Sequence, residues 1–312
     1  MQASGPMDTV ARILSVKLRG MLRGCEVDEK KLQELRLRVG APVILVIAGV
    51  EWYLTEKGKL TTQLSEAYRV DKNEVKETME YISNYSLYAF EEEVRQGFLT
   101  LSGGHRVGLG GRVLSENGHI RGMKYISFLN IRFAHQIKGC ADSVLPYIMQ
   151  EKKIMHTLIV SPPGGGKTTL LRDLVRQLSN RGYTIGVVDE RAEIAACYLG
   201  VPQNDVGIRT DVLDCCPKAE GMQMLIRSMA PQILAVDEIG QEADVQAVHY
   251  AIGCGCKLIA TVHAASYEEL EAKPLWRELL QAQIFERYIL LEKRNGIGKV
   301  REIRDSKGIV IC

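Results

Sequence analysis

The chain has 312 residues, more than one hydrophobic core usually supports, so about two domains are expected. Its composition, 46% hydrophobic and 25% charged, excludes a disordered or fibrous protein. A formal net charge of only +2 argues against a large nucleic-acid footprint. The longest nearly unbroken apolar run, residues 42–50, is about half of the roughly 20 residues that a membrane-spanning helix needs. With no secretory-signal pattern at the N-terminus, we expect a cytoplasmic protein.

The first part of the chain mixes helical and strand patterns. Helical patterns lie near residues 8–23 and 73–83, the second after Asp71, a typical helix N-cap residue. Strand patterns lie within residues 32–54, where we expect a strand pair, and within residues 94–113 and 124–137. This mixture predicts an N-terminal α+β domain over residues 1–145.

The second part alternates short apolar runs with helical periodicity, the pattern of a parallel sheet covered by helices. The apolar runs are residues 157–160, 183–188, 232–236 and 257–262. The helical segments between them are residues 167–180, 217–229 and 242–252. We expect an α/β domain over residues 146–312, a hinge between about residues 138 and 153, and a C-terminal antiparallel meander with turns at Asn295-Gly296 and Gly308.

The eight cysteines are scattered and form no CxxC pair. Cys215 and Cys216 are adjacent, and Cys254 and Cys256 flank one glycine, spacings that give a zinc site little support. We expect reduced, mostly packed thiols instead.

A glycine-rich segment joins the strand at 157–160 to the helix that begins at Lys167. Its sequence, SPPGGGKTT, matches GxxxxGK[ST] except that Ser161 replaces the first glycine. Consecutive glycines let backbone N–H groups curl around phosphate oxygens, and the helix N-terminus adds the positive end of a dipole. Lys167 would reach the β- and γ-phosphates of ATP, and the Thr168 hydroxyl would ligate Mg²⁺. The alternative is a glycine-rich turn that binds nothing. The predicted nucleotide-binding residues are Ser161, Pro162, Pro163, Gly164, Gly165, Gly166, Lys167, Thr168 and Thr169.

Two strands end in paired carboxylates. The run at 232–236 ends in Asp237 and Glu238, the form expected of a Walker B motif. Asp237 would hold the Mg²⁺ shell together with Thr168, and Glu238 would orient and deprotonate the attacking water. The run at 183–188 ends in Asp189 and Glu190, so a second base candidate competes. We favour Glu238 as the base and assign Glu190 a supporting role, while Asp189 fits a solvated loop as well as a site.

The strand at 257–262 ends at His263. The carboxyl edge of a parallel sheet is where ligands of α/β proteins bind, so His263 is a candidate sensor of the γ-phosphate. A structural histidine is the alternative. One strand between the two motif-bearing strands along the chain is typical of RecA-like ATPases, which makes the predicted fold a RecA-like P-loop ATPase core with an N-terminal α+β domain.

These segments together resemble the secretion-type ATPases of type II and type IV systems and pilus motors, in which a Walker A loop, an acidic box, a Walker B strand and a His box occur in this order. Here the boxes are SPPGGGKTT, VVDERAEIA, ILAVDEIG and ATVHAAS. A closer resemblance is to the stage III sporulation protein AA family of endospore-forming bacteria. It rests on LQELRLRVGAP, LSGGHRVGLGGR, LNIRFAHQIKG, SPPGGGKTTLLRDL, VVDERAEIA, RTDVLDCCPKAEGM and SMAPQILAVDEIG. The chain departs from these patterns at Gly164-Gly165, where more varied residues are expected, and at Asp237, where secretion ATPases often have glycine.

The resemblance implies Mg²⁺-dependent ATP hydrolysis by a motor, a homo-oligomer that forms a hexameric ring. It implies a cytoplasmic protein, peripheral at the mother-cell face of the outer forespore membrane. The partners would be membrane proteins of a stage III sporulation secretion-like complex, a channel between mother cell and forespore that the ATPase would energise.

Arginines of the N-terminal domain are the remaining candidates. In secretion ATPases such arginines reach a nucleotide site, often at a subunit boundary. Arg106 and Arg112 in GGHRVGLGGR and Arg132 in LNIRF occupy similar positions. A planar guanidinium is suited to neutralising charge on the γ-phosphate, so the resemblance implies a catalytic role. Salt-bridged strand arginines are the alternative. Arg209 is a further possibility within the ATPase domain.

Two other functions compete with a secretion motor. A nucleic-acid-binding RecA-like ATPase would need a basic groove with interleaved aromatic residues, and the sequence has no such patch. A nucleotide-gated scaffold with negligible turnover would bind ATP tightly without hydrolysing it.

Overall fold

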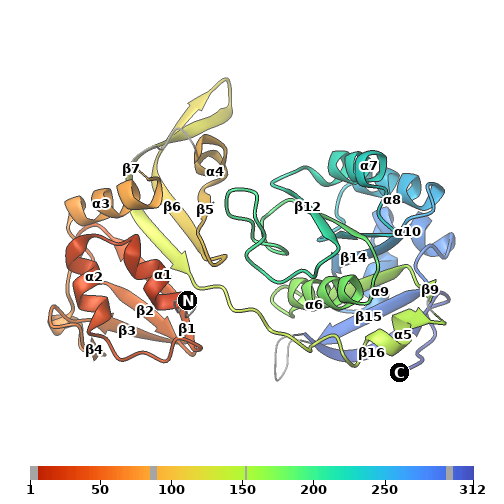
Figure 1. Ribbon diagram of the computed structural model, residues 1–312, viewed down its shortest axis with the longest axis horizontal. Coiled ribbons are helices and arrows are strands. Elements are labelled where there is room, and N and C mark those ends of the chain that lie inside the picture. Colours follow the sequence, from red (N-terminus) through yellow and green to blue (C-terminus); the bar gives the residue numbers. More distant parts are fainter. Residues whose placement is uncertain (1–5, 85–89, 152, 293–297) are drawn as a thin grey trace. The chain divides into compact units, whose positions relative to one another are not determined.

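The computed structural model describes residues 6–84, 90–151, 153–292 and 298–312 (Figure 1). The chain forms two compact units, Met1–His135 and Gln136–Cys312. Within the described residues, no helix combines the length and the apolar character that a membrane span requires.

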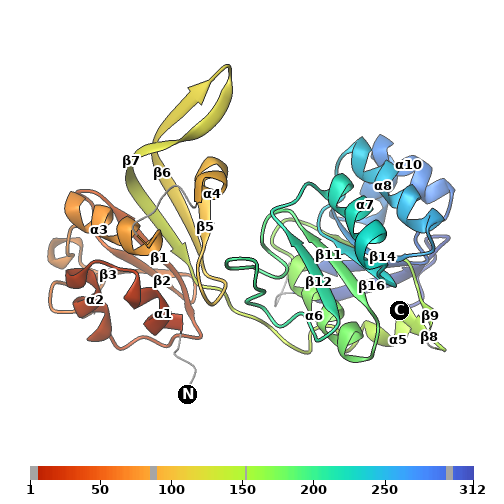
Figure 2. The same ribbon diagram turned by 45° about the horizontal axis from the view of Figure 1, so that its top comes forward.

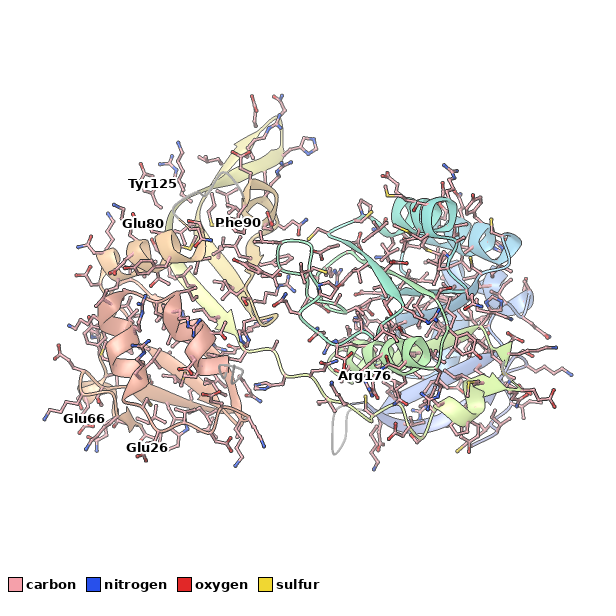
Figure 3. All side chains as sticks on the ribbon, viewed as in Figure 1. Glu26, Glu66, Glu80, Phe90, Tyr125 and Arg176 are labelled. Atoms are coloured by element: carbon pink, nitrogen blue, oxygen red, sulfur yellow. The ribbon has the colours of Figure 1, made fainter. Side chains whose placement is uncertain are left out.

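The boundary between the units lies earlier than the sequence predicts. It falls after His135 rather than at residue 145. The segment that follows is bonded to the second unit, where the Ala141 N–H donates to the Asp173 carboxylate at 2.9 Å. The guanidinium of Arg176, a residue labelled in Figure 3, also donates to Asp173, at 2.6 Å. This buried carboxylate therefore fixes the start of the second unit before residue 145.

The first unit is an antiparallel sheet with helices on one face (Figure 2). Over the described residues it has seven strands, in the order β4-β3-β2-β1-β7-β6-β5. The strands are β1 Leu32–Arg38, β2 Ile44–Ile47, β3 Val50–Leu54, β4 Leu60–Thr61, β5 Phe98–Thr100, β6 Arg106–Glu116 and β7 His119–Arg132. The helices are α1 Pro6–Arg12, α2 Val16–Arg23, α3 Lys72–Ile82 and α4 Glu91–Gln96, with a 3₁₀ turn at Leu64–Glu66.

Side-chain alternation along β1 explains the two unlike faces of this sheet. Leu35 and Leu37 are buried against the helices. Arg36, between them, points to the other face and pairs with Glu34 at 2.7 Å and Glu51 at 2.8 Å. The helix-covered face is thus the core of the unit, and the opposite face carries charge.

The single helix predicted over residues 8–23 is wrong, because Ser15 divides it into α1 and α2. The Ser15 hydroxyl caps α2 by accepting from the Leu18 N–H at 3.4 Å. The Ser15 N–H donates to the Thr78 hydroxyl at 3.1 Å instead of continuing the first helix. A buried polar contact between distant segments has overridden local helical periodicity.

Two other expectations for this unit have different outcomes. The cap at Asp71 is confirmed, with Glu74 completing a capping box at the start of α3. The strand pair expected within residues 32–54 is wrong in number, because three strands lie there. Ala48 and Gly49, both with positive φ, form the tight turn that makes room for β3.

The second unit is a mostly parallel sheet. Over the described residues it has seven strands, in the order β12-β11-β13-β14-β10-β15-β16. The strands are β10 Thr157–Ser161, β11 Ile185–Asp189, β12 Thr210–Asp214, β13 Ile233–Val236, β14 Lys257–His263, β15 Arg287–Glu292 and β16 Lys299–Asp305, with a separate pair β8 Met149–Gln150 and β9 Lys153–Ile154. The helices are α5 Leu145–Ile148, α6 Lys167–Asn180, α7 Lys218–Met229, α8 Glu242–Gly253, α9 Tyr267–Ala272 and α10 Pro274–Gln281.

Helices cover both faces of this sheet. Ile159 and Ile259 pack into one cluster with Leu171 of α6. Leu158, on the opposite face of β10, packs into another with Val248 of α8. Because both faces are apolar, the strands are continuous hydrophobic runs, as the sequence indicates.

The predicted alternation of strands and helices is confirmed, and β12 is an addition. The C-terminal meander is confirmed in part: β16 pairs antiparallel with β15, and Gly308 takes a φ of +78° in the turn that follows. The turn expected at Asn295-Gly296 lies outside the described residues. The parallel strands all end at one edge of the sheet, and the motif residues collect there.

Candidate nucleotide site

The segment between β10 and α6 has the backbone of a phosphate-binding loop. Gly164 and Gly166 take φ values of +76° and +93°, which favour glycine. A Cβ at Gly165 would lie 2.2 Å from the Ser161 Oγ and 3.2 Å from the Pro162 carbonyl oxygen, so a side chain there would force the Ser161 hydroxyl to move. The Gly298 N–H donates to the Gly165 carbonyl at 3.0 Å, which ties the start of β16 to the loop.

Lys167 and Thr168, the first residues of α6, both contact Asp237. The Lys167 ammonium lies 2.8 Å from one Asp237 carboxylate oxygen, and the Thr168 hydroxyl donates to the other at 2.7 Å. Asp237 directly follows β13, and β14 lies between β13 and β10 in the sheet. The structure therefore brings the two predicted motifs together although they are far apart along the chain.

The environment of Asp237 favours its charged form. Burial by itself would raise the pKa of Asp237, but the charge of Lys167 and hydrogen bonds from Lys167 and two hydroxyl groups outweigh it. The pKa of Asp237 is held below its ordinary value. Asp237 thus presents negatively charged oxygens beside the hydroxyl group of Thr168.

These oxygens suit a magnesium ion. Mg²⁺ prefers hard oxygen ligands, and in nucleotide sites it takes few from the protein because phosphates and waters supply the rest. The Thr168 hydroxyl and the Asp237 carboxylate, 2.7 Å apart, form such a partial set. No cluster of three or more His, Cys, Asp or Glu side chains suited to a metal occurs among the residues that the structure describes.

Glu238 is held by β14. Its backbone N–H donates to the Thr261 hydroxyl at 2.9 Å, and the same hydroxyl donates to Asp237. Glu238 takes a φ of +53°, a conformation that non-glycine residues adopt at some cost. Thr261 therefore fixes both carboxylates of the pair.

The Glu238 carboxylate is surrounded by cationic or titratable groups. Arg191 lies 2.9 Å from it, the His263 ring 3.6 Å, and the Lys167 ammonium 4.0 Å. His263, at the end of β14, also approaches the Ser161 carbonyl at 3.4 Å. His263 thus lies beside both the loop and the base candidate, as predicted from its place at the strand end.

Glu190 is bonded elsewhere. Its carboxylate accepts from the buried ammonium group of Lys218, at the first turn of α7. It shares with Glu238 a small cavity at the carboxyl edge of the sheet. Lys218 thus occupies one oxygen of Glu190, and the supporting role assigned to Glu190 stays a prediction.

Asp189 does not lie in a solvated loop. It is buried, and its carboxylate accepts from the backbone N–H groups of residues 193 to 196. Burial raises the pKa of Asp189, and these hydrogen bonds offset part of the rise. Asp189 shapes the loop after β11 from inside.

The three arginine candidates lie in the first unit, whereas the loop lies in the second. Arg106, at the start of β6, covers the Phe98 ring, with its guanidinium carbon 3.5 Å from the ring centroid. Arg132, opposite it on β7, is exposed and lies 3.5 Å from Glu34. Arg112 is exposed further along β6. Both readings from the sequence, catalytic and structural, remain compatible with these positions.

Sequence reasoning missed three residues of the site. Thr261 lies inside a buried strand, where a threonine carries no motif signal. Arg191 and Lys218 contact the two candidate carboxylates, but their partners are 47 and 28 residues away along the chain. The one available signal was that Arg191 directly follows Asp189-Glu190 at a strand end.

The chain is similar to known proteins over nearly its whole length. A family model described as "Sporulation stage III, protein AA" matches residues 6–311. Stage III sporulation protein AA of Bacillus subtilis (strain 168) is 40% identical over 314 residues, covering 98% of this chain and 97% of that protein.

Two solved structures share the fold. The pilus retraction motor PilT, solved with ADP bound, has a TM-score of 0.57 and 18% identity, covering 88% of this chain and 78% of its own. The ATPase DotB of Legionella pneumophila has a TM-score of 0.55 and 13% identity, covering 84% and 72%.

The strand order and the loop at the head of α6 define the second unit as a RecA-like P-loop ATPase fold. The chain belongs to the sporulation stage III protein AA family. The family indicated by the sequence segments is thereby confirmed.

Proposed function

We propose that this protein hydrolyses ATP in the presence of Mg²⁺. The observation that carries the proposal is the convergence of Lys167 and Thr168 on Asp237 beneath a glycine-rich loop whose Gly164 and Gly166 take positive φ values. Backbone N–H groups of the loop and the N-terminus of α6 provide a site for phosphates. Glu238 follows Asp237 at the same edge, where it can contact a water molecule.

Each residue has a distinct role in this proposal. Lys167 neutralises the β- and γ-phosphates, and Thr168 and Asp237 hold Mg²⁺, which draws charge from the phosphate oxygens when bound. Glu238 accepts a proton from water, whose oxygen bonds to the γ-phosphorus as the bond to the ADP oxygen breaks. His263, beside Glu238, is placed to sense the γ-phosphate.

The family and the fold extend the proposal to a motor. The family model is described as a sporulation stage III protein, and two proteins of the same fold are named an ATPase and a pilus retraction motor. We place this chain as a hexameric ATPase at the cytoplasmic, mother-cell face of a membrane. It would energise a channel complex between mother cell and forespore, with membrane proteins of that complex as partners.

Nucleotide binding tests the site directly. Titration calorimetry with ADP and a non-hydrolysable ATP analogue, each with Mg²⁺, should give saturable binding by the full chain. Lys167→Ala should remove most of that affinity, because it deletes the charge facing the phosphates, and circular dichroism should show that the protein remains folded. Lys153→Ala, on exposed β9, is the matched control and should bind like the parent. Equal affinity in Lys167→Ala would rule out the loop as the phosphate site.

A further inference from the structure

Lys218 is a buried cation in a position that is unfavourable for a positive charge. Its side chain is 9% exposed, so its ammonium group has lost most of its water. It lies in the first turn of α7, where the helix dipole repels positive charge. A lysine in such a place requires a compensating anion, and Glu190 directly after β11 is that anion.

The Lys218–Glu190 pair forms part of the wall of a small cavity. The cavity measures about 10 Å³ and is lined by five carboxylate side chains and two cations, Arg191 and Lys218. That volume is close to the minimum that holds one water molecule, and the lining is polar. Glu238, the proposed base, is one of the five carboxylates.

The two cations of this cavity differ in kind. Arg191 is 61% exposed and contacts Glu238 itself, so it can move away when a ligand arrives. Lys218 is buried and contacts Glu190, which belongs to the other pair of carboxylates, Asp189 and Glu190. Lys218 is therefore the fixed cation of the wall, and Arg191 is the adjustable one.

We propose that Lys218 is a positioning residue for ATP hydrolysis: it holds the Glu190 carboxylate in place so that the cavity beside Glu238 keeps the shape that orients the attacking water. This inference rests on the proposed function. Lys218 does not bind the phosphates and does not take the proton. It acts through Glu190, whose carboxylate it fixes from the head of α7.

Steady-state hydrolysis and nucleotide binding of Lys218→Met, which removes the charge and keeps the length of the side chain, test this role. The expected result is a fall in kcat of about tenfold, the scale of a misoriented reactant, with nucleotide affinity unchanged. Lys218→Arg should restore part of the loss, because it keeps the charge. Lys257→Met is the matched control: Lys257 also pairs with a glutamate, Glu286 at 3.0 Å, at the amino end of β14, and its loss should leave kcat unchanged.

A double-mutant cycle gives the sharpest readout. Glu190→Gln should lower kcat by about the same factor as Lys218→Met. The double variant should be no slower than either single variant, because both substitutions break the same Lys218–Glu190 contact. If Lys218→Met fails to fold, Glu190→Gln and Lys218→Arg replace it in the test. Each should show a fall in kcat with nucleotide affinity unchanged.

Three outcomes would overturn the inference. The first is a kcat of Lys218→Met equal to that of the parent. The second is a loss of kcat in the double variant equal to the product of the two single losses, and the third is a parallel fall in nucleotide affinity and kcat. Each contradicts a positioning role while leaving the proposed function standing. Absence of hydrolysis by the parent protein, with Lys167-dependent nucleotide binding intact, would instead contradict the proposed function and this inference together.

Discussion

Thr261 shows how a residue without a motif can organise a site. Its single hydroxyl donates to Asp237 and accepts from the Glu238 N–H, so it sets the direction in which the chain leaves β13. The positive φ of Glu238 costs on the order of 1 to 3 kcal/mol, and it persists only because neighbours hold it. The sequence predicts the two carboxylates, but the strand order is needed to show that Thr261 of the neighbouring strand orients them.

Thr261→Val keeps the shape of the side chain and removes both hydrogen bonds. It leaves a buried N–H without its acceptor, so urea unfolding should show a loss of about 1 to 3 kcal/mol. Hydrolysis should fall as well, because the carboxylate pair loses its support. Thr157→Val, on the buried start of β10, is the control that should lose stability without an intrinsic loss of activity. Normal turnover in Thr261→Val would contradict the assigned role.

Substitutions of the two base candidates should slow hydrolysis by different factors. Glu238→Gln should retain nucleotide and slow hydrolysis by about 10² to 10⁴, the range typical of a lost general base. Glu190→Gln should slow it by only about tenfold, because Glu190 is occupied by Lys218 and acts on geometry. Single-turnover phosphate release from each variant decides between them, and a larger loss in Glu190→Gln would reverse the ranking.

At the scale of elements, the second unit was more predictable than the first. Strands β10, β11, β13 and β14 are buried on both faces, so they stand out as apolar runs. In the first unit, the break at Ser15 depends on Thr78, and the third strand depends on a turn with positive φ at Ala48. Such features depend on distant contacts or unusual backbone, which periodicity does not record.

One histidine in each unit, the buried His105 and the half-buried His156, couples stability to pH. Burial lowers the pKa of His105 to about 4, with a smaller effect of His135, and its ring accepts from the Ala134 N–H at 3.0 Å. Burial likewise lowers the pKa of His156 to about 4, where it accepts from the Leu258 N–H at 3.2 Å. Each histidine is therefore neutral in the folded unit at a pH where the unfolded chain binds a proton.

The sign of the pH effect follows from these pKa values. The free energy of unfolding should be highest above pH 6.5 and should fall as the pH drops toward 4, by up to about 3 kcal/mol for His105 and by less for His156, which solvent screens in part. His105→Gln should reduce the dependence of the free energy of unfolding on pH in the first unit only. Trp52 and Trp276 are the chain's two tryptophans, one in each unit, so fluorescence of Trp52→Phe and Trp276→Phe proteins reports each unit separately. A pH-independent free energy of unfolding between 6.5 and 4.5 would contradict this account.

At the scale of the whole molecule, the candidate residues are divided between two units. The P-loop, Asp237 and Glu238 lie in the second unit, and Arg106, Arg112 and Arg132 lie in the first. The sequence predicted the phosphate site because its spacing is local and its chemistry is specific. It could not decide among the arginines, because a catalytic role for any of them would depend on domain closure or on a neighbouring subunit, which local sequence does not encode.

We therefore predict that hydrolysis depends on assembly. At least one of Arg106→Ala, Arg112→Ala and Arg132→Ala should bind ATP and melt like the parent but hydrolyse about 10³-fold more slowly, the scale of a delivered arginine. If the arginine acts in trans, mixing that variant with Lys167→Ala protein should restore some activity at shared interfaces. Normal hydrolysis by all three variants, with specific activity flat across protein concentration, would mean that this mechanism must be abandoned.

The central claim is that the edge formed by Lys167, Thr168, Asp237 and Glu238 hydrolyses ATP. The measurement that tests it most directly is phosphate release from ATP by the purified full chain over a wide range of protein concentration. It is made with Mg²⁺, with a chelator in place of Mg²⁺, and with the Lys167→Ala protein. The account predicts release that requires Mg²⁺ and is at least about 10²-fold lower in Lys167→Ala. Release that persists in Lys167→Ala, or tight ATP binding by the parent with no phosphate released at any concentration, would contradict it.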